Sequence, residues 1–260
     1  MQITPRNRTF DFAVPQFWFG GQRAITIFYD NLSILFPEGE RFFMQSVRAH
    51  QQYLDSDVGR AEVRAFLQQE GAHSREHHRF NERLAALGYP VPALERGVKW
   101  IFDRARRLPK RWQLSATCAL EHFTASLGHL LLSDLSVLGA AHPEMAALWQ
   151  WHAAEEIEHK AVAFDAYRAA GAPYVERAGI MLLTTVIFWA KVIEQQARMM
   201  KAAGIAWDLA EWGRLLHFLY VSPGPMRRRV PLYLDYFRPR FHPWDLDDRA
   251  LINLEGKATA

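Results

Sequence analysis

Apolar side chains recur at helical spacing along most of the chain, whereas the alternation typical of strands is weak. Gly and Pro fall between these periodic segments, at positions where they end helices. Gly88 with Pro90, and Gly171 with Pro173, close two of the longest segments. The pattern predicts helices over residues 38–53, 58–87, 111–138, 144–170 and 174–203, and a shorter helix near 207–220. It therefore indicates an all-α protein.

The order of these segments predicts a ferritin-like four-helix bundle. Two helical pairs are separated by a longer connection over residues 91–110, itself expected to be helical around 94–106, and bundles of this type have such an order. We expect one domain over 1–260, with the bundle at about 38–170 and additional C-terminal helices and a basic tail over 174–260. A chain of 260 residues is long for one domain, but a helical domain with one large core reaches this size.

Glutamate and histidine are placed on four of the predicted helices in a metal-binding pattern. Two helices carry a Glu and a His three residues apart, which puts both side chains on one helix face. Two others each carry one Glu as a further candidate ligand. This is the inward-facing ligand set of di-iron and di-manganese bundles, and buried carboxylates are costly unless they are paired or bound to metal. The candidate ligands are Glu40, Glu70, His73, Glu121, Glu156 and His159.

Two further histidines extend the same helix faces. His77 lies seven residues after Glu70, and His152 lies seven residues before His159. We include both as candidate ligands. Each could instead be a donor that orients a carboxylate, or a buried histidine satisfied by other partners.

Several glutamates offer alternatives to this set. Glu155 competes with Glu156, which we prefer because it alone gives the Glu-x-x-His spacing. Glu40 could instead stabilise the start of its helix through the helix dipole. We expect three neighbouring glutamates to be solvated: Glu38, Glu76 and Glu158.

Composition limits the compartment and the partners. The 31 basic residues nearly match the 28 acidic ones, so the net charge of +3 does not favour nucleic acid as a partner. Cys118 is the single cysteine, which excludes an internal disulfide and fits a reducing cytoplasm. Residues 1–10 do not resemble a signal peptide, and the most apolar run, 178–190, is too short to cross a bilayer. We therefore expect a cytoplasmic protein.

The C-terminal part of the chain suggests two contacts. Its tail alternates arginines with aromatic residues from Arg227 to Trp244, which could bring the protein to anionic headgroups at the periphery of the inner membrane. A charged cover over the bundle is the alternative. The apolar fifth helix could be a core element or a dimer face, and we lean towards a homodimer.

Five motifs resemble those of a known family. They are Phe36-Pro-Glu-Gly-Glu-Arg-Phe-Phe43, Glu70-x-x-His73-x-x-x-His77, Glu121-His-x-Thr124, Glu156-x-x-His159-Lys160 and Tyr236-Phe-Arg-Pro-Arg-Phe-His-Pro-Trp244. Through them most of the chain resembles the bacterial predicted metal-dependent hydrolases. The stripe from His152 to His159 is also similar to that of di-iron arylamine N-oxygenases, which implies oxygen chemistry but no substrate.

These observations favour a dinuclear metal enzyme, most of all a di-iron one, that activates dioxygen to oxidise a small organic or lipid-like substrate. Manganese or zinc could replace iron, and the sequence does not indicate the electron donor. Thr124, one helical turn beyond Glu121, could donate a hydrogen bond to bound oxygen. The alternatives are a metal-dependent hydrolase of an ester or phosphoester, and a non-catalytic iron-binding or ferroxidase protein.

Overall fold

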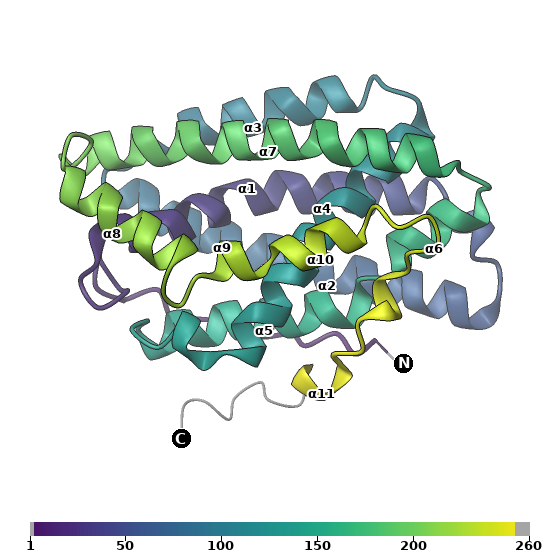
Figure 1. Ribbon diagram of the computed structural model, residues 1–260, viewed down its shortest axis with the longest axis horizontal. Helices are drawn as coiled ribbons and strands as arrows, with labels where there is room; N and C mark the ends of the chain where they lie inside the picture. The colour runs from purple at the N-terminus through teal and green to yellow at the C-terminus, as the bar shows by residue number, and fades with distance from the viewer. Residues whose placement is uncertain (1–2, 253–260) are drawn as a thin grey trace.

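The computed structural model describes residues 3–252, which form helices and contain no strand. The predicted all-α class is therefore confirmed (Figure 1). Two extensively packed helix pairs, α1 with α2 and α4 with α5, make up the central bundle. The four helices are α1 (Arg23–Arg48), α2 (Asp57–Ala86), α4 (Lys110–Ser133) and α5 (Pro143–His159).

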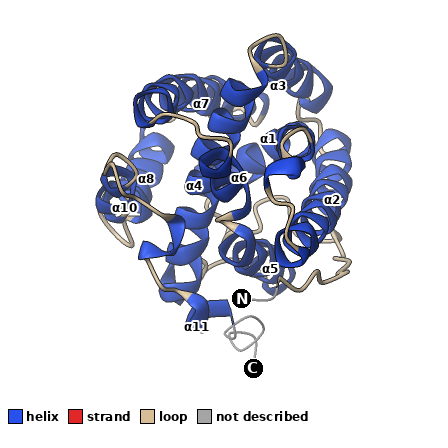
Figure 2. Ribbon diagram, turned by 90° about the vertical axis from the view of Figure 1, so that its right-hand side faces the viewer, coloured by secondary structure: helices blue, strands red, loops and turns tan. Residues whose placement is uncertain are grey.

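Further helices cover this bundle. α3 (Val91–Ala105) and α7 (Tyr174–Ala202) run side by side along one face of it (Figure 1). The view in Figure 2 places α2 to one side of α1 and α4, and α8 and α10 to the other. The remaining short elements are η1 (Gln51–Tyr53), η2 (Leu135–Val137), α6 (Val162–Ala169), α8 (Leu209–Tyr220), α9 (Pro225–Arg228), α10 (Val230–Asp235), η3 (Pro243–Asp245) and α11 (Arg249–Ile252).

The first helix differs most from its prediction. It begins at Arg23 rather than at residue 38, and Pro37 lies inside it. Residues 24–34 are buried on all sides, so they show no amphipathic stripe that would reveal a helix. Glu40 is consequently a mid-helix residue, and the alternative that it stabilises a helix start is wrong.

The predicted helix over 144–170 is also corrected, because it is broken after His159 into α5 and α6. At the break, the Lys160 ammonium donates to the carbonyl of Leu246 and to Asp248. The Glu-x-x-His segment therefore occupies the last turns of α5, ahead of the bend. Close packing of α5 on α4 depends on Gly128, where an added Cβ would lie 2.9 Å from the Ala153 carbonyl oxygen.

Two apolar clusters flank the middle of the bundle. Along α2, Val63 and Phe66 belong to one cluster, and Phe80 and Leu84 belong to the other. The polar residues 69–77 of α2 lie largely between them and are the candidates for chemistry. Within the described range, α7 is the one helix long and apolar enough to cross a membrane, which corrects the expectation that its apolar run is too short, although a single such helix is weak evidence for a span.

Candidate metal centre

The structure brings the six predicted ligands together in the interior of the bundle. All are buried, with at most 2 % of each residue exposed. Their ligand atoms, with those of His152, fall into three overlapping groups, in each of which all atoms lie within 4.8 Å of one another. The groups are Glu40 with His73 and His152, Glu70 with His73 and Glu156, and Glu70 with Glu121 and His159.

Glu156 connects the two ends of this cluster. Its Oε1 atom lies 3.0 Å from His152 Nε2 and 3.6 Å from His73 Nδ1. Its Oε2 atom lies 3.6 Å from His159 Nε2. One carboxylate oxygen therefore faces each half, which is the placement a carboxylate needs to bridge two ions.

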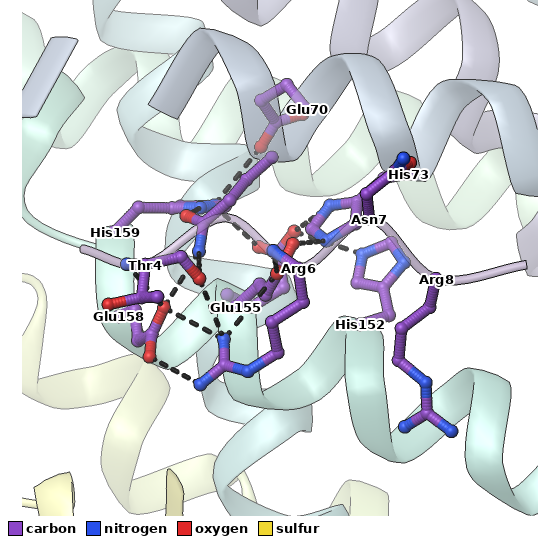
Figure 3. Close-up of polar contacts among 12 residues, drawn as sticks. Thr4, Arg6, Asn7, Arg8, Glu70, His73, His152, Glu155, Glu158 and His159 are labelled. Carbon is purple, nitrogen blue, oxygen red and sulfur yellow. Dashed lines mark hydrogen bonds and ion pairs between the residues drawn. The ribbon is translucent and has the colours of Figure 1, made fainter. Parts of the chain in front are cut away.

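His159 is the imidazole of the second half. Its Nε2 atom lies 3.1 Å from Glu70 Oε1 and 3.4 Å from Glu121 Oε2. Figure 3 shows the Glu70 and His159 side chains directed toward each other from α2 and α5. Two carboxylates and an imidazole thus converge there.

The cluster has the chemical properties of a metal site. Both carboxylate oxygens of Glu40, Glu70 and Glu121 are buried without a hydrogen-bond partner among residues 3–252. His73, His152 and His159 each have such a nitrogen as well. Buried polar atoms are normally satisfied, so this convergence of oxygen and imidazole lone pairs fits divalent or trivalent cations.

Electrostatics supports the same conclusion. Burial, and then repulsion from neighbouring carboxylates, raises the pKa values of Glu40 and Glu70 well above their usual range. Burial raises the pKa of Glu121 to about 7. Burial alone would lower the pKa of His159, but the carboxylates of Glu156 and Glu121 outweigh it and raise that pKa. The cluster therefore retains protons until cations replace them.

A line of polar contacts runs into the centre from α1. Pro37 has no N–H, so the Ser33 carbonyl one turn earlier lacks its helical donor, and Asn81 Nδ2 donates to it at 3.3 Å. Asn81 Oδ1 in turn accepts the Ser33 hydroxyl at 2.9 Å. Ser33 Oγ lies 2.9 Å from His77 Nδ1, and His77 Nε2 lies 2.7 Å from His152 Nδ1.

This line fixes which ring nitrogens carry protons. The Ser33 hydroxyl has given its hydrogen to Asn81, so His77 Nδ1 must be the donor to Ser33. Burial lowers the pKa of His77 and keeps the ring neutral, which leaves its Nε2 as an acceptor for His152 Nδ1–H. His152 Nε2, the ring nitrogen left by this contact, then faces Glu156. Either a proton or a metal ion on Nε2 would make this approach to the carboxylate favourable.

The predicted candidates His77 and His152 thus occupy different positions. His152 presents a free nitrogen to the cluster, and we retain it as a proposed ligand. Both nitrogens of His77 are engaged, by Ser33 and by His152. These contacts favour the alternative that His77 orients another group.

A second line of contacts fixes His159 from the opposite side. Gln69 Nε2 donates to Glu158 Oε2 at 2.8 Å, so Gln69 Oε1 accepts from His159 Nδ1 at 2.9 Å. Arg6 holds Glu158 with both guanidinium branches, at 2.7 and 3.0 Å (Figure 3). His159 Nε2 is thereby directed at the carboxylates.

Glu155 and Glu156 both face His73, but differently. Glu155 Oε2 lies 3.0 Å from His73 Nε2, while Glu155 Oε1 accepts the backbone N–H of Arg6 at 2.7 Å (Figure 3). A proton on His73 Nε2 leaves Nδ1 facing Glu156. The contacts favour Glu156 as the ligand and Glu155 as the group that orients His73.

The expectation that three glutamates are solvated is wrong. Glu158 is buried and bound by Arg6 and Gln69. Glu76 and Glu38 are also buried, in ion pairs with arginines. Glu158 is bound in part by the N-terminal segment. That segment has no hydrophobic periodicity from which a contact with Glu158 could be predicted.

A cavity of about 270 Å³ lies between α1, α3, α4 and α7. Gly39 and Phe43 border it on either side of Glu40, and Leu120 and Thr124 do so on either side of Glu121. The Thr124 hydroxyl donates to the Glu121 carbonyl at 3.0 Å. In this rotamer its oxygen can accept, rather than donate, a hydrogen bond from a molecule in the cavity.

Four of the lining residues are themselves 40–54 % exposed, which marks where the cavity opens. They are Leu108, Trp112, Leu183 and Ile187. The walls are apolar almost throughout: among the described residues, no Asp, Glu or His lines the cavity.

The basic tail packs on the bundle. Tyr236 and Phe241 are buried beside Arg177, which donates to the carbonyls of Tyr236 and Arg238. Arg228 pairs with Asp134. This arrangement favours the predicted cover over the bundle.

Comparison with known proteins gives one match. A family model described as "Predicted metal-dependent hydrolase" matches residues 4–247, nearly the whole chain. No curated protein and no solved structure matches significantly. The match supports metal dependence, and its description favours hydrolysis over dioxygen activation.

Proposed function

We propose that this chain, which belongs to the family of predicted metal-dependent hydrolases, holds two iron ions and uses dioxygen to oxidise an apolar substrate. The observation that carries this proposal is an apolar cavity lined by the chain neighbours of two candidate ligands, Glu40 and Glu121. A more general conclusion, that the protein is metal-dependent and has a buried cluster of Glu and His, rests on the family match and on the geometry together.

The cavity favours oxidation because of what its walls lack. Hydrolysis of an ester or phosphoester calls for a group that protonates the leaving oxygen, and for polar contacts to the substrate. Among the described residues, the polar side chains of the lining are limited to Thr124, Thr184, Lys191 and Arg229. Oxidation of an unactivated C–H bond needs neither a proton donor for a leaving group nor polar contacts to the substrate, and apolar walls keep water away from the reaction.

The two irons, when bound, would supply the site and the electrons for dioxygen reduction. Hydroxylation of a C–H bond consumes one dioxygen, two electrons and two protons and releases one water, so an external reductant is required. The chain's own part is to hold the ligands, exclude water and place the substrate. Phe43, Leu120 and Phe123 form the wall beside the ligands, and Thr124 is proposed to accept a hydrogen bond there.

Hydrolysis is the second candidate, because the family description favours it. Two ions held by the same ligands could lower the pKa of a water molecule and bind an ester or phosphoester oxygen. The mouth of the cavity at Leu183 and Ile187 would admit an ester with an apolar chain.

One experiment separates the two activities. Protein loaded anaerobically with ferrous iron is given dioxygen and a reductant in the presence of an apolar substrate, and dioxygen uptake and oxidised products are measured. Zinc- or manganese-loaded protein is assayed in parallel with nitrophenyl esters of increasing chain length. Dioxygen uptake coupled to product supports the proposal. Ester hydrolysis without dioxygen uptake would replace it by the second candidate. Glu121→Ala is the control that should abolish either activity.

A further inference from the structure

Arg229, at the junction of α9 and α10, lines the cavity. The residue is only 9 % exposed. Its neighbours Arg227 and Arg228 stay at or near the surface, and Arg228 pairs with Asp134. Of the three, Arg229 alone is buried and borders the apolar cavity.

The guanidinium is only partly satisfied. Nε donates to Ser126 Oγ at 3.1 Å and Nη2 to the Phe123 carbonyl at 3.2 Å, while Nη1 lies 3.9 Å from Met226 Sδ. A guanidinium has five N–H donors, so these contacts leave two without a partner among residues 3–252. No carboxylate in that range pairs with it.

Arg177 shows how a buried arginine is satisfied elsewhere in this protein. Two carbonyl oxygens accept from it, and four aromatic rings surround its guanidinium within 5.5 Å. Arg229 has one such ring, Phe123 at 5.4 Å, and lines the cavity. The difference marks Arg229 as a site for an anion.

The charge of Arg229 persists at neutral pH. Burial lowers its pKa to about 10, which still leaves the side chain protonated. A buried cation is costly unless an anion pairs with it. An apolar wall with one fixed guanidinium is complementary to a molecule with an apolar body and one planar anionic head, and a carboxylate matches the guanidinium in two parallel hydrogen bonds.

We propose that the cavity binds a long-chain carboxylic acid, with its carboxylate paired to Arg229 and its chain along the apolar walls. This inference rests on the proposed function in taking the cavity as the substrate site. Lys191, the other cation of the lining, is already paired with Glu194. The single available charge therefore suits a monoanionic carboxylate better than a phosphate.

The order of residues along α4 orients this acid. Trp112 lies at the mouth, Glu121 in the centre, and Phe123 and Ser126 at Arg229. Ser126 is five residues beyond Glu121, about 8 Å along the helix. The centre therefore lies beside the carbons near the carboxylate, and the methyl end points towards the mouth.

Binding of decanoate and decan-1-ol to the full-length protein, purified with its metal and kept anaerobic, tests the proposal by calorimetry. Wild type should bind decanoate roughly 30-fold more tightly than the alcohol, the effect of one desolvated charge pair. Arg229→Met should abolish that preference but keep binding of the alcohol, and Arg229→Lys should retain part of it. Arg227→Met, an exposed neighbour on α9, is the matched control and should leave both affinities unchanged.

Equal affinity of wild type for the two ligands would overturn the proposal, even if Arg229→Met failed to fold. So would a preference for decanoate that survives in Arg229→Met, because the carboxylate would then be bound elsewhere. Metal content and dioxygen uptake are measured on the same samples. If the protein prefers decanoate but takes up no dioxygen, only the proposed oxidase activity is contradicted. If it takes up dioxygen but does not prefer decanoate, only the proposed carboxylate site is contradicted.

Discussion

His77 Nε2 lies 2.7 Å from His152 Nδ1, and this contact determines which nitrogen of His152 faces the cluster. The contact depends on Pro37. Because proline has no N–H, the Ser33 carbonyl accepts a hydrogen bond from Asn81 instead of from the helix backbone. A helix irregularity on α1 is thereby linked to the ligand geometry on α5. His77 acts in this line as a positioning residue.

Replacing His77 by leucine should weaken metal binding by about 10- to 100-fold, the usual effect of removing a group that orients a ligand. His77→Gln keeps an oxygen that can accept from His152 and should retain most of the affinity. Competition with a chelator measures both. An equal loss in the two variants would instead indicate that His77 is itself a ligand. His78→Leu, at an exposed neighbouring position, should change nothing.

Removal of a proposed ligand should reduce metal binding more than replacement of His77 does. Glu121→Ala and His159→Ala each delete a group from the same half of the cluster, so we expect the metal content to fall to one ion per chain or fewer. Elemental analysis of the purified variants checks this. Full occupancy in both would contradict the assignment of the site.

Glu158→Ala should also weaken metal binding, although Glu158 is no ligand. Without it the Gln69 amide loses the acceptor that fixes its orientation, and His159 loses its defined tautomer. We expect roughly a 10-fold loss of metal affinity. Glu82→Ala on exposed α2 surface is the control. Unchanged metal affinity in Glu158→Ala would show that the contacts from Arg6 through Glu158 to His159 are not needed for metal binding.

The clustering of the candidate ligands was predictable from sequence because helical spacing alone places them on shared helix faces. Glu70 with His73, and Glu156 with His159, needed only the knowledge that residues three apart share a face. The groups that orient them were not predictable, because Ser33 and Gln69 act on histidines 44 and 90 residues away.

Two features of the fold escaped prediction for physical reasons. The first half of α1 is buried all round and therefore lacks an amphipathic period. Arg229 stands in a run of three arginines that resembles a surface patch, and only the bend between α9 and α10 turns it inward.

The metal-free protein should lose stability as the pH rises from 7 to 9. Folding raises the pKa values of Glu40, Glu70 and His159 well above their usual range. A group with a raised folded-state pKa stabilises the protein below its unfolded-state pKa, and this stability is lost as the pH rises through the folded-state value. Glu121, whose pKa folding raises from 4.5 to about 7, loses its contribution mostly between these two values, below that window.

Thermal unfolding of metal-free protein measures this effect, with a Tm shift of about 2–4 °C for each kcal/mol lost. His73 and His77 have lowered pKa values and oppose the trend only below their ordinary value of 6.5, so they do not affect the window. Metal-loaded protein should show a smaller fall, because bound cations stabilise the deprotonated ligands. A Tm of the metal-free protein that stays constant from pH 7 to 9 would contradict the prediction.

Substitutions of Gly39, next to Glu40 in the middle of α1, test whether the cavity holds the substrate. A Cβ added there would lie 3.7 Å from both Phe43 Cζ and Phe102 Cζ, an ordinary contact. Gly39→Ala should therefore raise the free energy of unfolding by about 0.5–1 kcal/mol through helix propensity. Gly71→Ala on α2, where nothing lies within 4 Å of the added atom, should do the same and is the matched control.

A larger side chain at Gly39 should separate stability from function. Gly39→Leu would project into the cavity beside Glu40 and compete for the space of an apolar chain. We expect unchanged metal content but at least a 10-fold weaker binding of decanoate, with a shorter acid such as hexanoate affected less. Chemical denaturation, elemental analysis and calorimetry give the three readouts. Decanoate binding that survives in a folded, metal-loaded Gly39→Leu protein would mean that the substrate lies outside this cavity, because Gly39 is one of its lining residues.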